Sequence, residues 1–502
     1  MTMKFSKPSG AAPGKCFRAV LGVAGALAAV CGVRPPTAYA AAPDSLNRIA
    51  IHLRQRRSRP ILGIGVQWDP YTYPPTPGQW KIIIHRMDFM RPSFLRVMCI
   101  HLARPSRVQK PLAWAQAHGA KVILGTWWPP NLKNHHALNN ILWAKRVAMR
   151  VKTLRDRYGF RCIRYYNFIN EPEAMPIDRW AAAAGALHQA FHEAGLQHKV
   201  RIIGPDTYGD PDYAPPALRA VYDWPLLLPI ARHAARFVGV YDIHWYPQDA
   251  EITGNVICPT LMRERHEVLK LDPGAIHKPF LMSESGLIQG RCHGDQQPRV
   301  KTFGYGVLMT DYAAEVFEAG WSGISAWDLD DALHVVRSTR HLPHPPGPYT
   351  LKLWGFWNSQ GPAMGHPRQF NPRPWFYTWS LLSRLFPGGT RIIESHRIPG
   401  HPSLRLLAGE QHIQDNLKWG VVIVNIADRP QKFLLRIPGL DHRMTTYEYT
   451  YFKSMRPVNS ALLPIPAAVW RHESPAHGFT VSMPGRGVIF LTNRSILASP
   501  NP

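Results

Sequence analysis

Between residues 61 and 387 the chain repeats one pattern of hydrophobic and polar positions: a short apolar run, a loop with polar or aromatic residues, then a longer stretch of helical periodicity. Short runs without polar alternation are typical of strands that are buried on both faces of a parallel sheet. Eight such runs occur, at 61–66, 94–98, 121–124, 163–169, 200–203, 237–243, 279–282 and 323–327. Eight strand–helix units predict an α/β fold, a (β/α)₈ barrel of the TIM type.

The stretches between the runs carry apolar residues at helical spacing, most clearly at 143–157, 180–194 and 300–319. A doubly wound open sheet also alternates strands with helices, but no Gly-x-Gly-x-x-Gly motif follows a run here. The eighth loop, 328–374, is too long for an ordinary connector, and we expect it to form a wall of the active-site face. A last helix at 375–385 ends the predicted barrel.

Beyond residue 387 the hydrophobic period changes from helical to two. Alternating segments at 419–426, 433–437, 444–452 and 479–491 are separated by turn-forming residues. This pattern predicts a small antiparallel β-sandwich domain over 388–502, packed on a catalytic barrel over 61–387.

Residues 1–40 have the pattern of a secretory signal peptide. Five basic residues and no acid accompany an uncharged run at 19–33, and Ala38-Tyr39-Ala40 supplies a small-residue cleavage site. We expect cleavage after Ala40 and a secreted or periplasmic protein. A lipid anchor on Cys31 is the weaker alternative, because the residues before it fit a lipobox poorly. A basic, arginine-rich lead-in, 41–60, follows the signal.

The chain is strongly basic, with 59 lysines and arginines against 33 acidic residues, a formal net charge of +26. Five of these charges would leave with the signal peptide, so that the mature chain would carry +21. Such an excess suggests an acidic partner, but export and the absence of a recognised module argue against nucleic acid. A hydrophobic content of 45% excludes global disorder, and no later run approaches the roughly 18 apolar residues of a membrane span.

Export would leave four cysteines in a compartment where disulfides persist. Cys258 follows the sixth run and Cys292 follows the seventh, in adjacent loops, and we predict a disulfide between them. Cys99 and Cys162 lie near predicted strands and are expected to be buried thiols. The spacing of the cysteines does not match a zinc site, and we expect neither a metal nor a cofactor.

Two of the runs end in a carboxylate, at the place where barrel enzymes carry their catalytic groups. The fourth run leads into Asn170-Glu171-Pro172, and the seventh into Ser283-Glu284-Ser285. Hydrolysis of a glycosidic bond needs two carboxyl groups on one cavity, one to protonate the leaving oxygen and one to act at the anomeric carbon. A single glutamate at a strand end is most often a surface or helix-capping residue, but two at equivalent ends indicate this chemistry.

These motifs resemble the paired signatures of clan A glycoside hydrolases, whose catalytic domain is a (β/α)₈ barrel with a retaining mechanism. The resemblance covers the whole barrel. Further matching residues are Arg96 on strand two, the strand-six pair His244 and Tyr246, and Trp327, whose counterpart floors the sugar site in the clan. Trp127-Trp128-Pro129-Pro130, the segment 383–388 and the appended β domain are most similar to family 30, with family 39 close behind.

The resemblance implies a role for each matching residue. Glu171 would be the general acid and then the base, and Glu284 the nucleophile that forms a glycosyl-enzyme ester. The guanidinium of Arg96 would favour the charged form of this nucleophile. The residues that we expect to bind or organise the sugar are Asn170, Arg96, His244, Tyr246, Trp327, Trp127, Trp128, Trp68 and Asp69.

The function that we expect is therefore a secreted retaining glycoside hydrolase that cleaves β-linked glycosides or polysaccharides. The alternative is an inactive barrel that binds glycans or serves as a scaffold. Neither the Gly-x-Ser-x-Gly elbow of a serine esterase nor the His-Glu-x-x-His motif of a metalloprotease occurs. We expect a monomer with an oligo- or polysaccharide partner, which is acidic if the basic loop around Arg291 forms a uronate subsite.

Overall fold

The computed structural model describes residues 47–52, 59–98, 105–127, 141–173, 175–209, 224–342, 347–414 and 416–496. The predicted signal peptide, most of the basic lead-in, Cys99 and Trp128 lie outside the described residues. Residues 47–502 form one compact unit. Among the described helices, none is long and apolar enough to cross a bilayer.

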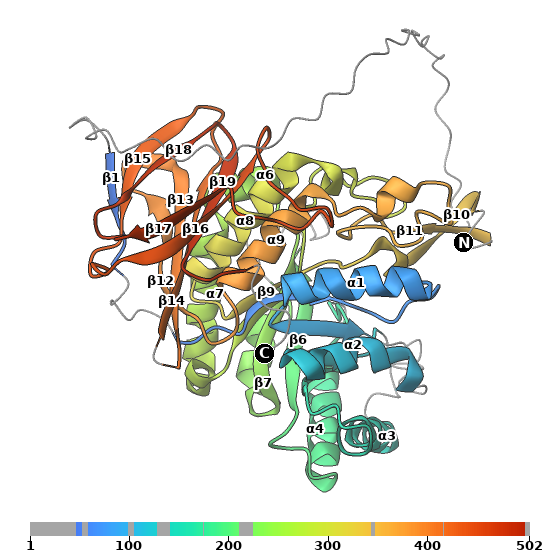
Figure 1. The fold of residues 1–502 in the computed structure, drawn as a ribbon. Coiled ribbons are helices and arrows are strands. Elements are labelled where there is room, and N and C mark those ends of the chain that lie inside the picture. The colour runs from blue at the N-terminus through green and yellow to red at the C-terminus, as the bar shows by residue number, and fades with distance from the viewer. Residues whose placement is uncertain are drawn as a thin grey trace, which may run out of the picture. The chain divides into compact units, whose positions relative to one another are not determined.

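Eight parallel strands close into a barrel in sequence order (Figure 1). The strands are β2 (Gly63–Gln67), β3 (Phe94–Met98), β4 (Lys121–Gly125), β5 (Ile163–Asn167), β6 (Arg201–Gly209), β7 (Val238–Trp245), β8 (Phe280–Ser285) and β9 (Gly323–Ala326). Pairing of β2 with β9 closes the barrel. The predicted (β/α)₈ barrel is confirmed, and each strand overlaps one of the eight apolar runs.

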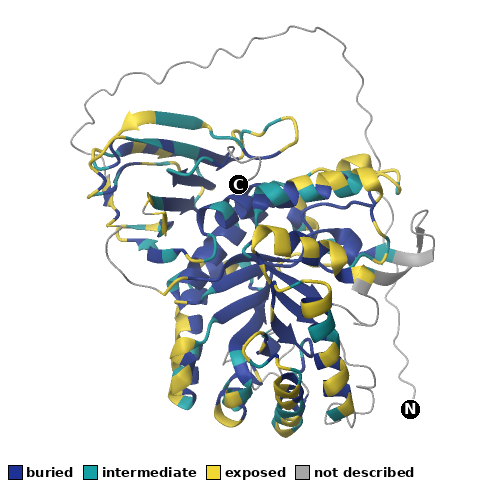
Figure 2. Cartoon of the chain, turned by 60° about the horizontal axis from the view of Figure 1, so that its bottom comes forward, coloured by how far each residue is buried: buried dark blue, intermediate teal, exposed yellow. Residues whose placement is uncertain are grey.

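The barrel interior is filled by side chains rather than left as a channel. One buried layer consists of Leu62, Phe94, Ile123, Tyr165, Ile203, Val240 and Leu281. A Cβ at Gly65 would lie 2.4 Å from the Phe94 ring, so glycine is required on β2 for this ring to fill the barrel. Figure 2 shows the barrel strands buried along most of their length, with exposed residues on the outer faces of the helices.

Helices surround the barrel and follow the strands along the chain. The α-helices are α1 (Pro77–Met90), α2 (Pro105–His118), α3 (Ile141–Lys152), α4 (Ile177–Glu193), α5 (Leu227–His233), α6 (Asp249–Thr253), α7 (Ile257–Leu271), α8 (Phe303–Glu318) and α9 (Pro374–Leu385). The 3₁₀ helices are η2 (Ala235–Phe237), η3 (Pro273–His277), η4 (Pro298–Lys301), η5 (Asp331–Leu333) and η6 (Pro367–Phe370). The predicted helix at 143–157 divides into α3 and a π-helical turn, η1 (Thr153–Arg157).

A buried ion pair between Asp331 and Arg373 stabilises the long eighth loop. The loop contains η5, the hairpin of β10 (Val335–Leu342) and β11 (Gly347–Leu351), and η6. Asp331 pairs with Arg373, which stands at the start of α9, and also accepts bonds from the backbone N–H groups of Trp354 and Gly355 at 3.1 and 2.8 Å. These bonds fix the segment that carries Trp354 at the carboxyl end of the barrel.

The C-terminal residues form two sheets that share one hydrophobic core. The larger sheet has the order β12 (Arg391–Ile398), β13 (His401–Ile413), β14 (Asn416–Asn425), β19 (Gly487–Thr492), β16 (Met444–Phe452) and β17 (Ala468–Glu473). The smaller sheet has the order β1 (Asn47–Ala50), β15 (Gln431–Arg436) and β18 (Phe479–Met483). The predicted β-sandwich is confirmed. Part of the predicted lead-in is a strand of this sandwich, because β1 pairs in parallel with β15.

A buried ionic cluster joins the sandwich to α8 of the barrel. Arg405 on β13 donates to Asp311 at 3.0 Å and also contacts Glu315 at 3.3 Å and Glu318. Arg397 on β12 donates to the second oxygen of Asp311 at 2.7 Å. Burial raises the pKa of Glu315 to about 8, against the opposing effect of Arg405.

We expect Arg405→Leu to lower the free energy of unfolding by about 3–5 kcal/mol, because it leaves buried carboxylates without their partner. Urea unfolding followed by circular dichroism measures this loss. Arg443→Leu is the matched control, because Arg443 is exposed and lies in the same domain. Equal unfolding midpoints for the two variants would contradict a stabilising role of the cluster.

Candidate active site

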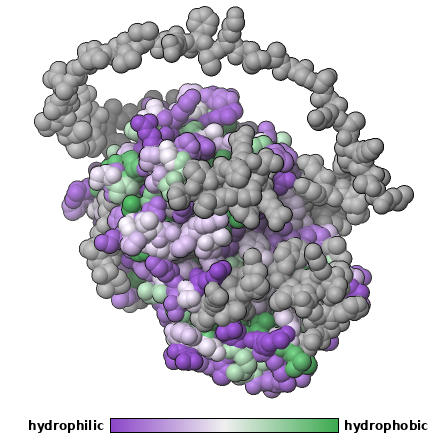
Figure 3. All heavy atoms as spheres, turned by 90° about the vertical axis from the view of Figure 1, so that its right-hand side faces the viewer, coloured by the Kyte–Doolittle hydropathy of each residue, from purple (hydrophilic) through white to green (hydrophobic). Residues whose placement is uncertain are grey.

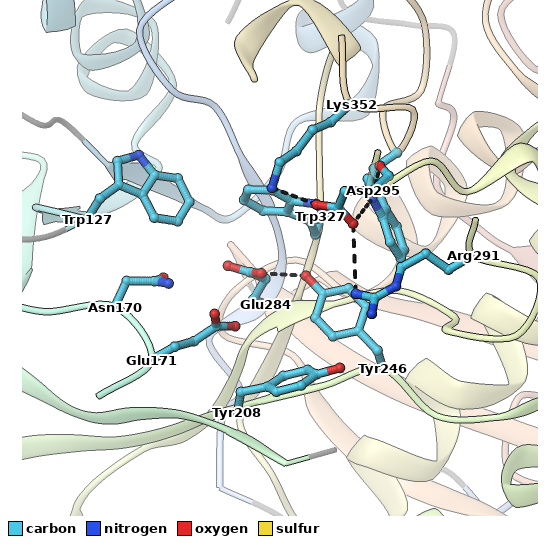
Figure 4. Close-up of a pocket in the computed structure, with 11 residues that line it drawn as sticks. Trp127, Asn170, Glu171, Tyr208, Tyr246, Glu284, Arg291, Asp295, Trp327 and Lys352 are labelled. Atoms are coloured by element: carbon cyan, nitrogen blue, oxygen red, sulfur yellow. Dashed lines mark hydrogen bonds and ion pairs between the residues drawn. The ribbon is translucent and has the colours of Figure 1, made fainter. Parts of the chain in front are cut away.

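A cavity of about 440 Å³ opens where the barrel strands end (Figure 4). Its walls come from the ends of β4 to β9, from the loop after β8 and from the long eighth loop. The lining residues are Trp127, Asn170, Glu171, Tyr208, Tyr246, Glu284, Arg291, Asp295, Trp327, Lys352 and Trp354. The structure therefore brings both predicted catalytic glutamates to one cavity, together with Asn170, Tyr246, Trp327 and Trp127.

Glu284 lies on β8 and is held from two sides. The Arg96 guanidinium donates to its Oε2 at 2.7 Å, and the Tyr246 hydroxyl donates to its Oε1. Only 5% of Glu284 is exposed. The carboxylate therefore has a fixed orientation towards the cavity.

Burial raises the pKa of Glu284 above its usual value, although His244 and Arg96 both act to lower it. As predicted, the Arg96 guanidinium favours the charged form of Glu284. Desolvation of the carboxylate has the larger effect, so the pKa of Glu284 is raised overall. The ionised form of Glu284 therefore depends on the cations around it.

Glu171 follows β5 in a left-handed backbone conformation with a φ of 47°. Such a conformation is unfavourable for a residue with a side chain and requires support from its surroundings. Its backbone N–H donates to the Asp206 carbonyl at 3.0 Å, and its Oε1 lies 3.0 Å from the His244 Nδ1. The side chain is 32% exposed, and this exposed part lines the cavity.

The two glutamates approach each other closely. One oxygen of Glu171 and one oxygen of Glu284 lie within 4.8 Å of each other. Retaining glycosidases have carboxyl groups about 5–5.5 Å apart, whereas inverting enzymes need about 6.5–9.5 Å to admit a water molecule. The separation therefore fits direct attack by one carboxylate on a sugar that the other protonates.

Arg96 and His244 lie behind the glutamates rather than in the cavity, and both are fully buried. Besides Glu284, the guanidinium donates to Asn170 at 2.6 Å and to Asp206 at 2.9 Å. Because Arg96 holds the amide oxygen of Asn170, the NH₂ group of this residue remains to donate. These contacts make Arg96 and His244 positioning residues.

A buried polar chain supports His244. Its Nε2 lies 3.1 Å from Asp206, whose backbone N–H donates to Asp242 at 3.1 Å. Ser283 donates to the other oxygen of Asp242 at 2.8 Å. Burial disfavours the imidazolium, but the carboxylates of Asp206 and Glu284 outweigh it and raise the pKa of His244 well above its usual value. As an imidazolium, His244 donates to Glu171 through Nδ1 and to Asp206 through Nε2.

Aromatic rings bound the cavity on several sides. Trp127 and Trp327 meet edge to face with ring centroids 5.7 Å apart, and His334 stacks on Trp327 at 4.3 Å. Trp354 and Tyr208 flank Tyr246, with centroids 5.3 and 5.7 Å from its ring. Flat apolar faces beside hydrogen-bonding groups are suited to contact with sugar rings.

Two predicted substrate contacts are wrong. Trp68 is fully buried and packs against Trp80 and Trp114 at 6.4 and 6.0 Å, so it belongs to the core between α1 and α2. Asp69 is only 3% exposed and does not line the cavity. Its oxygens accept from Gln67 and from the Met98 backbone, and burial raises its pKa to about 7.

The predicted disulfide between Cys258 and Cys292 is also wrong, because both thiols are free. Cys258 lies buried on α7, where its backbone N–H donates to Glu315 of α8 and its sulfur contacts Met262. Cys292 is exposed in a short turn that pairs with Gln296. The two side chains therefore point into different surroundings. Cys162 is a buried free thiol, as predicted.

Two cations and one acid form the rim of the cavity, where the sequence indicated only a basic loop. The Lys352 ammonium lies 2.6 Å from Asp295, and Arg291 lies 3.9 Å from the other oxygen of this carboxylate (Figure 4). One acid is thus shared by two cations, and the rim keeps a positive excess. Arg299 of the same loop instead forms a two-pronged pair with Asp249 at 2.8 and 2.6 Å.

Among the residues that the structure describes, two groups of side chains bring acids and a histidine close enough to hold a metal ion: Glu171, His244 and Glu284, and Asp206, Asp242 and His244. In both groups the candidate ligand atoms already exchange hydrogen bonds with each other, with Arg96 or with Ser283. An ion would have to displace these bonds and lie beside a buried guanidinium. The donor set is therefore that of a proton-transfer network rather than of a preformed metal centre.

Sequence reasoning missed several residues of this site, namely Asp206, Tyr208, Asp242, Asp295, Lys352 and Trp354. Asp206 and Tyr208 belong to β6, which was predicted to end at 203 and instead extends to Gly209. The polar segment Asp206-Thr207-Tyr208 at the end of an apolar run was the signal that could have revealed them.

No protein-family model matches the sequence, and no curated protein matches it. Solved structures do match. A GH30 endoxylanase from Clostridium papyrosolvens has 14% identity and a TM-score of 0.60, over 89% of this chain and 99% of that one. A GH51 α-L-arabinofuranosidase from Thermotoga petrophila has 12% identity and a TM-score of 0.58, over 89% and 100%.

A conserved exported protein from Bacteroides fragilis matches with 14% identity and a TM-score of 0.59, over 88% of this chain and 99% of that one. At such identities these matches show a shared fold and no more. The fold that they share, a (β/α)₈ barrel with a β domain, is that of the clan A glycoside hydrolases, as predicted.

Proposed function

We propose that the protein is a secreted or periplasmic retaining glycoside hydrolase that cleaves β-linked glycans through Glu171 and Glu284. The observation that carries this proposal is the pair of glutamates within 4.8 Å of each other on one cavity. The shared fold with glycosidases agrees with it. Export rests on the sequence of residues 1–40, and one similar structure is named an exported protein.

In the first step, the Glu284 carboxylate attacks the anomeric carbon and forms an ester. The bond to the leaving oxygen breaks, and Glu171 transfers its proton to that oxygen. His244 donates to Oε1 of Glu171, which leaves Oε2 to carry this proton. Asn170 is placed to donate to the sugar hydroxyl next to the anomeric carbon, a contact that strengthens in the transition state.

In the second step, Glu171 removes a proton from a water molecule as that water attacks the anomeric carbon. The ester bond breaks, and Glu284 leaves as a carboxylate. Arg96 and Tyr246 both donate to this carboxylate and stabilise it as a leaving group. Two displacements at one carbon give a product with the configuration of the substrate.

The second candidate function is a barrel that binds glycans without cleaving them. Incubation of the purified protein with a panel of β-linked glycans, followed by measurement of new reducing ends, separates the two. NMR of the first product formed tests retention, because a retaining enzyme releases the β-anomer before mutarotation. Binding without reducing ends, or initial release of the α-anomer, would contradict the proposal.

The positive rim supports an acidic substrate. Arg291 and Lys352 share Asp295, so a sugar carboxylate that reaches the rim meets a net positive site. We expect Arg291→Gln to lower kcat/KM about tenfold on a uronate-bearing oligosaccharide and to change it little on the neutral analogue.

Comparison of kcat/KM for both substrates measures this discrimination. Lys301→Gln is the matched control, because Lys301 is exposed and belongs to the same loop region outside the cavity. Equal losses on the two substrates would rule out a uronate subsite at Arg291.

A further inference from the structure

A second hollow, of about 380 Å³, lies at the opposite end of the barrel from the two glutamates. It is formed where β4, β5 and β6 begin and where the chain enters them from the preceding helices. We call it the basal hollow. Its lining residues are Gln116, Gly119, Ala120, Lys121, Arg161, Cys162, Arg164, Tyr165, His198, Lys199 and Arg201.

The charged side chains of the basal hollow are all positive. Five of its lining residues are lysine or arginine and one is histidine, and these six residues are all exposed. None of the lining residues is acidic. Within the described part of the chain, no ion pair involves any of the six. Other exposed cations of this protein do have partners, such as Lys145 with Glu193 at 3.1 Å and Lys270 with Glu267 at 2.7 Å.

The cations of the basal hollow act on one another. Burial, followed by the charges of Arg164 and Arg201, lowers the pKa of Lys121. Arg164 also lowers the pKa of Arg155, after burial. Like charges around one concave surface raise the electrostatic free energy of the empty site, and a bound anion would lower it.

The remaining polar groups of the basal hollow are donors. The side-chain oxygen of Gln116 accepts from the Cys162 backbone N–H at 2.8 Å, which leaves the NH₂ group of Gln116 for a ligand. Burial raises the pKa of Tyr165 against the opposing charges of Arg201 and Arg164, so its hydroxyl remains protonated and able to donate. A ligand of this hollow must therefore supply acceptors.

We propose that the basal hollow is a binding site for an anionic glycan segment that carries sulfate or carboxylate groups. Its volume is at the small end of ligand pockets, which fits one or two charged sugar residues. A nucleic acid fits less well, because its bases stack on exposed aromatic faces and the lining contains no Trp or Phe, while its Tyr165 is only 7% exposed. Hydrophilic side chains cover most of the coloured surface of the face in Figure 3.

The basal hollow lies away from the catalytic cavity, so a glycan bound there would not be the segment that is cleaved. The cavity with Glu171 and Glu284 lies at the carboxyl ends of the strands, so the two sites face in opposite directions. A long acidic polysaccharide held at the basal hollow would raise the local concentration of further chain segments near the other end of the barrel. Binding at the basal hollow does not require that the protein hydrolyses glycans.

The test is calorimetric titration of the full chain with a sulfated hexasaccharide and, separately, with a hexagalacturonide that carries only carboxylates. The variant is Lys121→Gln with Arg164→Gln and Arg201→Gln. We expect it to weaken binding of at least one probe about tenfold and to reduce the dependence of Kd on salt. The probe that responds identifies the anionic group.

The matched control is Lys432→Gln with Arg443→Gln and Lys453→Gln, which removes three exposed cations of the β domain. This control should bind both probes as the unchanged protein does, and thermal unfolding should show that both triple variants remain folded. Equal weakening in the two variants would mean that net charge alone attracts the probes. That result, or tighter binding of a single-stranded oligonucleotide of equal charge at the same residues, would overturn the proposal.

Discussion

Glu284→Gln is expected to lower kcat by about 10⁴-fold, because it removes the atom that forms the covalent intermediate. The amide keeps the size of the side chain but has no lone pair of comparable nucleophilicity. It also brings an NH₂ group towards the donors Arg96 and Tyr246, which now hold a carboxylate. The measurement is kcat on an aryl glycoside with a good leaving group, for which proton donation matters least.

Glu473→Gln serves as the control, since Glu473 is exposed at the end of β17 and should leave kcat unchanged. The unchanged enzyme offers a second readout. Because burial raises the pKa of Glu284, kcat/KM should begin to fall at a higher pH than the usual glutamate pKa of about 4.3 as the solution is acidified. A variant that retained a tenth of the activity would exclude Glu284 as the nucleophile.

Glu171→Gln is expected to lower kcat/KM about 10³-fold on substrates with sugar leaving groups and much less on dinitrophenyl glycosides. The glutamine oxygen can still accept from His244, so the backbone and its neighbours should keep their arrangement. What is lost is the proton for the leaving oxygen and, in the second step, the base for water. The plot of log kcat/KM against leaving-group pKa should therefore become steeper.

Azide provides an independent check on Glu171. A small anion that needs no base can replace water at the glycosyl-enzyme, so the variant should recover activity with azide and yield the β-glycosyl azide. Glu473→Gln should show neither the steeper plot nor the recovery. If losses were the same for all leaving groups, Glu171 would act through the structure and not as an acid.

The barrel was predictable because a short, uninterrupted apolar run indicates a strand that is buried on both faces. The ends of the strands were less predictable, since polar residues there are also buried. β6 continues through Asp206 and Tyr208 because their polar groups find partners inside the barrel: Asp206 contacts Arg96, and the Tyr208 backbone contacts Glu173. Sequence composition alone assigns such residues to a loop.

The error at Trp68 has a geometric cause. Successive side chains of a strand point to opposite faces. Gln67 at the end of β2 points inward, where it accepts from Arg96, so Trp68 points outward to Trp80 and Trp114. From the sequence, Trp68 was assigned the same role as Trp127. The alternation of side chains along β2 instead places Trp68 in the core.

The disulfide between Cys258 and Cys292 was wrongly predicted because the two residues follow neighbouring strands. Neighbouring loops do not ensure that their side chains meet. Cys258 belongs to the first turn of α7, and the helix turns its side chain towards Met262 and α8. Loop order in a barrel is fixed by topology, but the direction of a helical side chain is not. The contribution of Lys352 to the positive rim was missed for a similar reason: Lys352 is 61 positions from Arg291, and the two share Asp295.

The pairing of β1 with β15 bears on how the chain folds during synthesis. β1 ends at Ala50, but β15 ends at Arg436 and β18 at Met483, so the three-stranded sheet cannot be completed until the whole barrel and most of the β domain have been made. Contacts between such distant segments form late and slowly. β1 therefore remains without its partner strand while the ribosome produces the residues between β1 and β15.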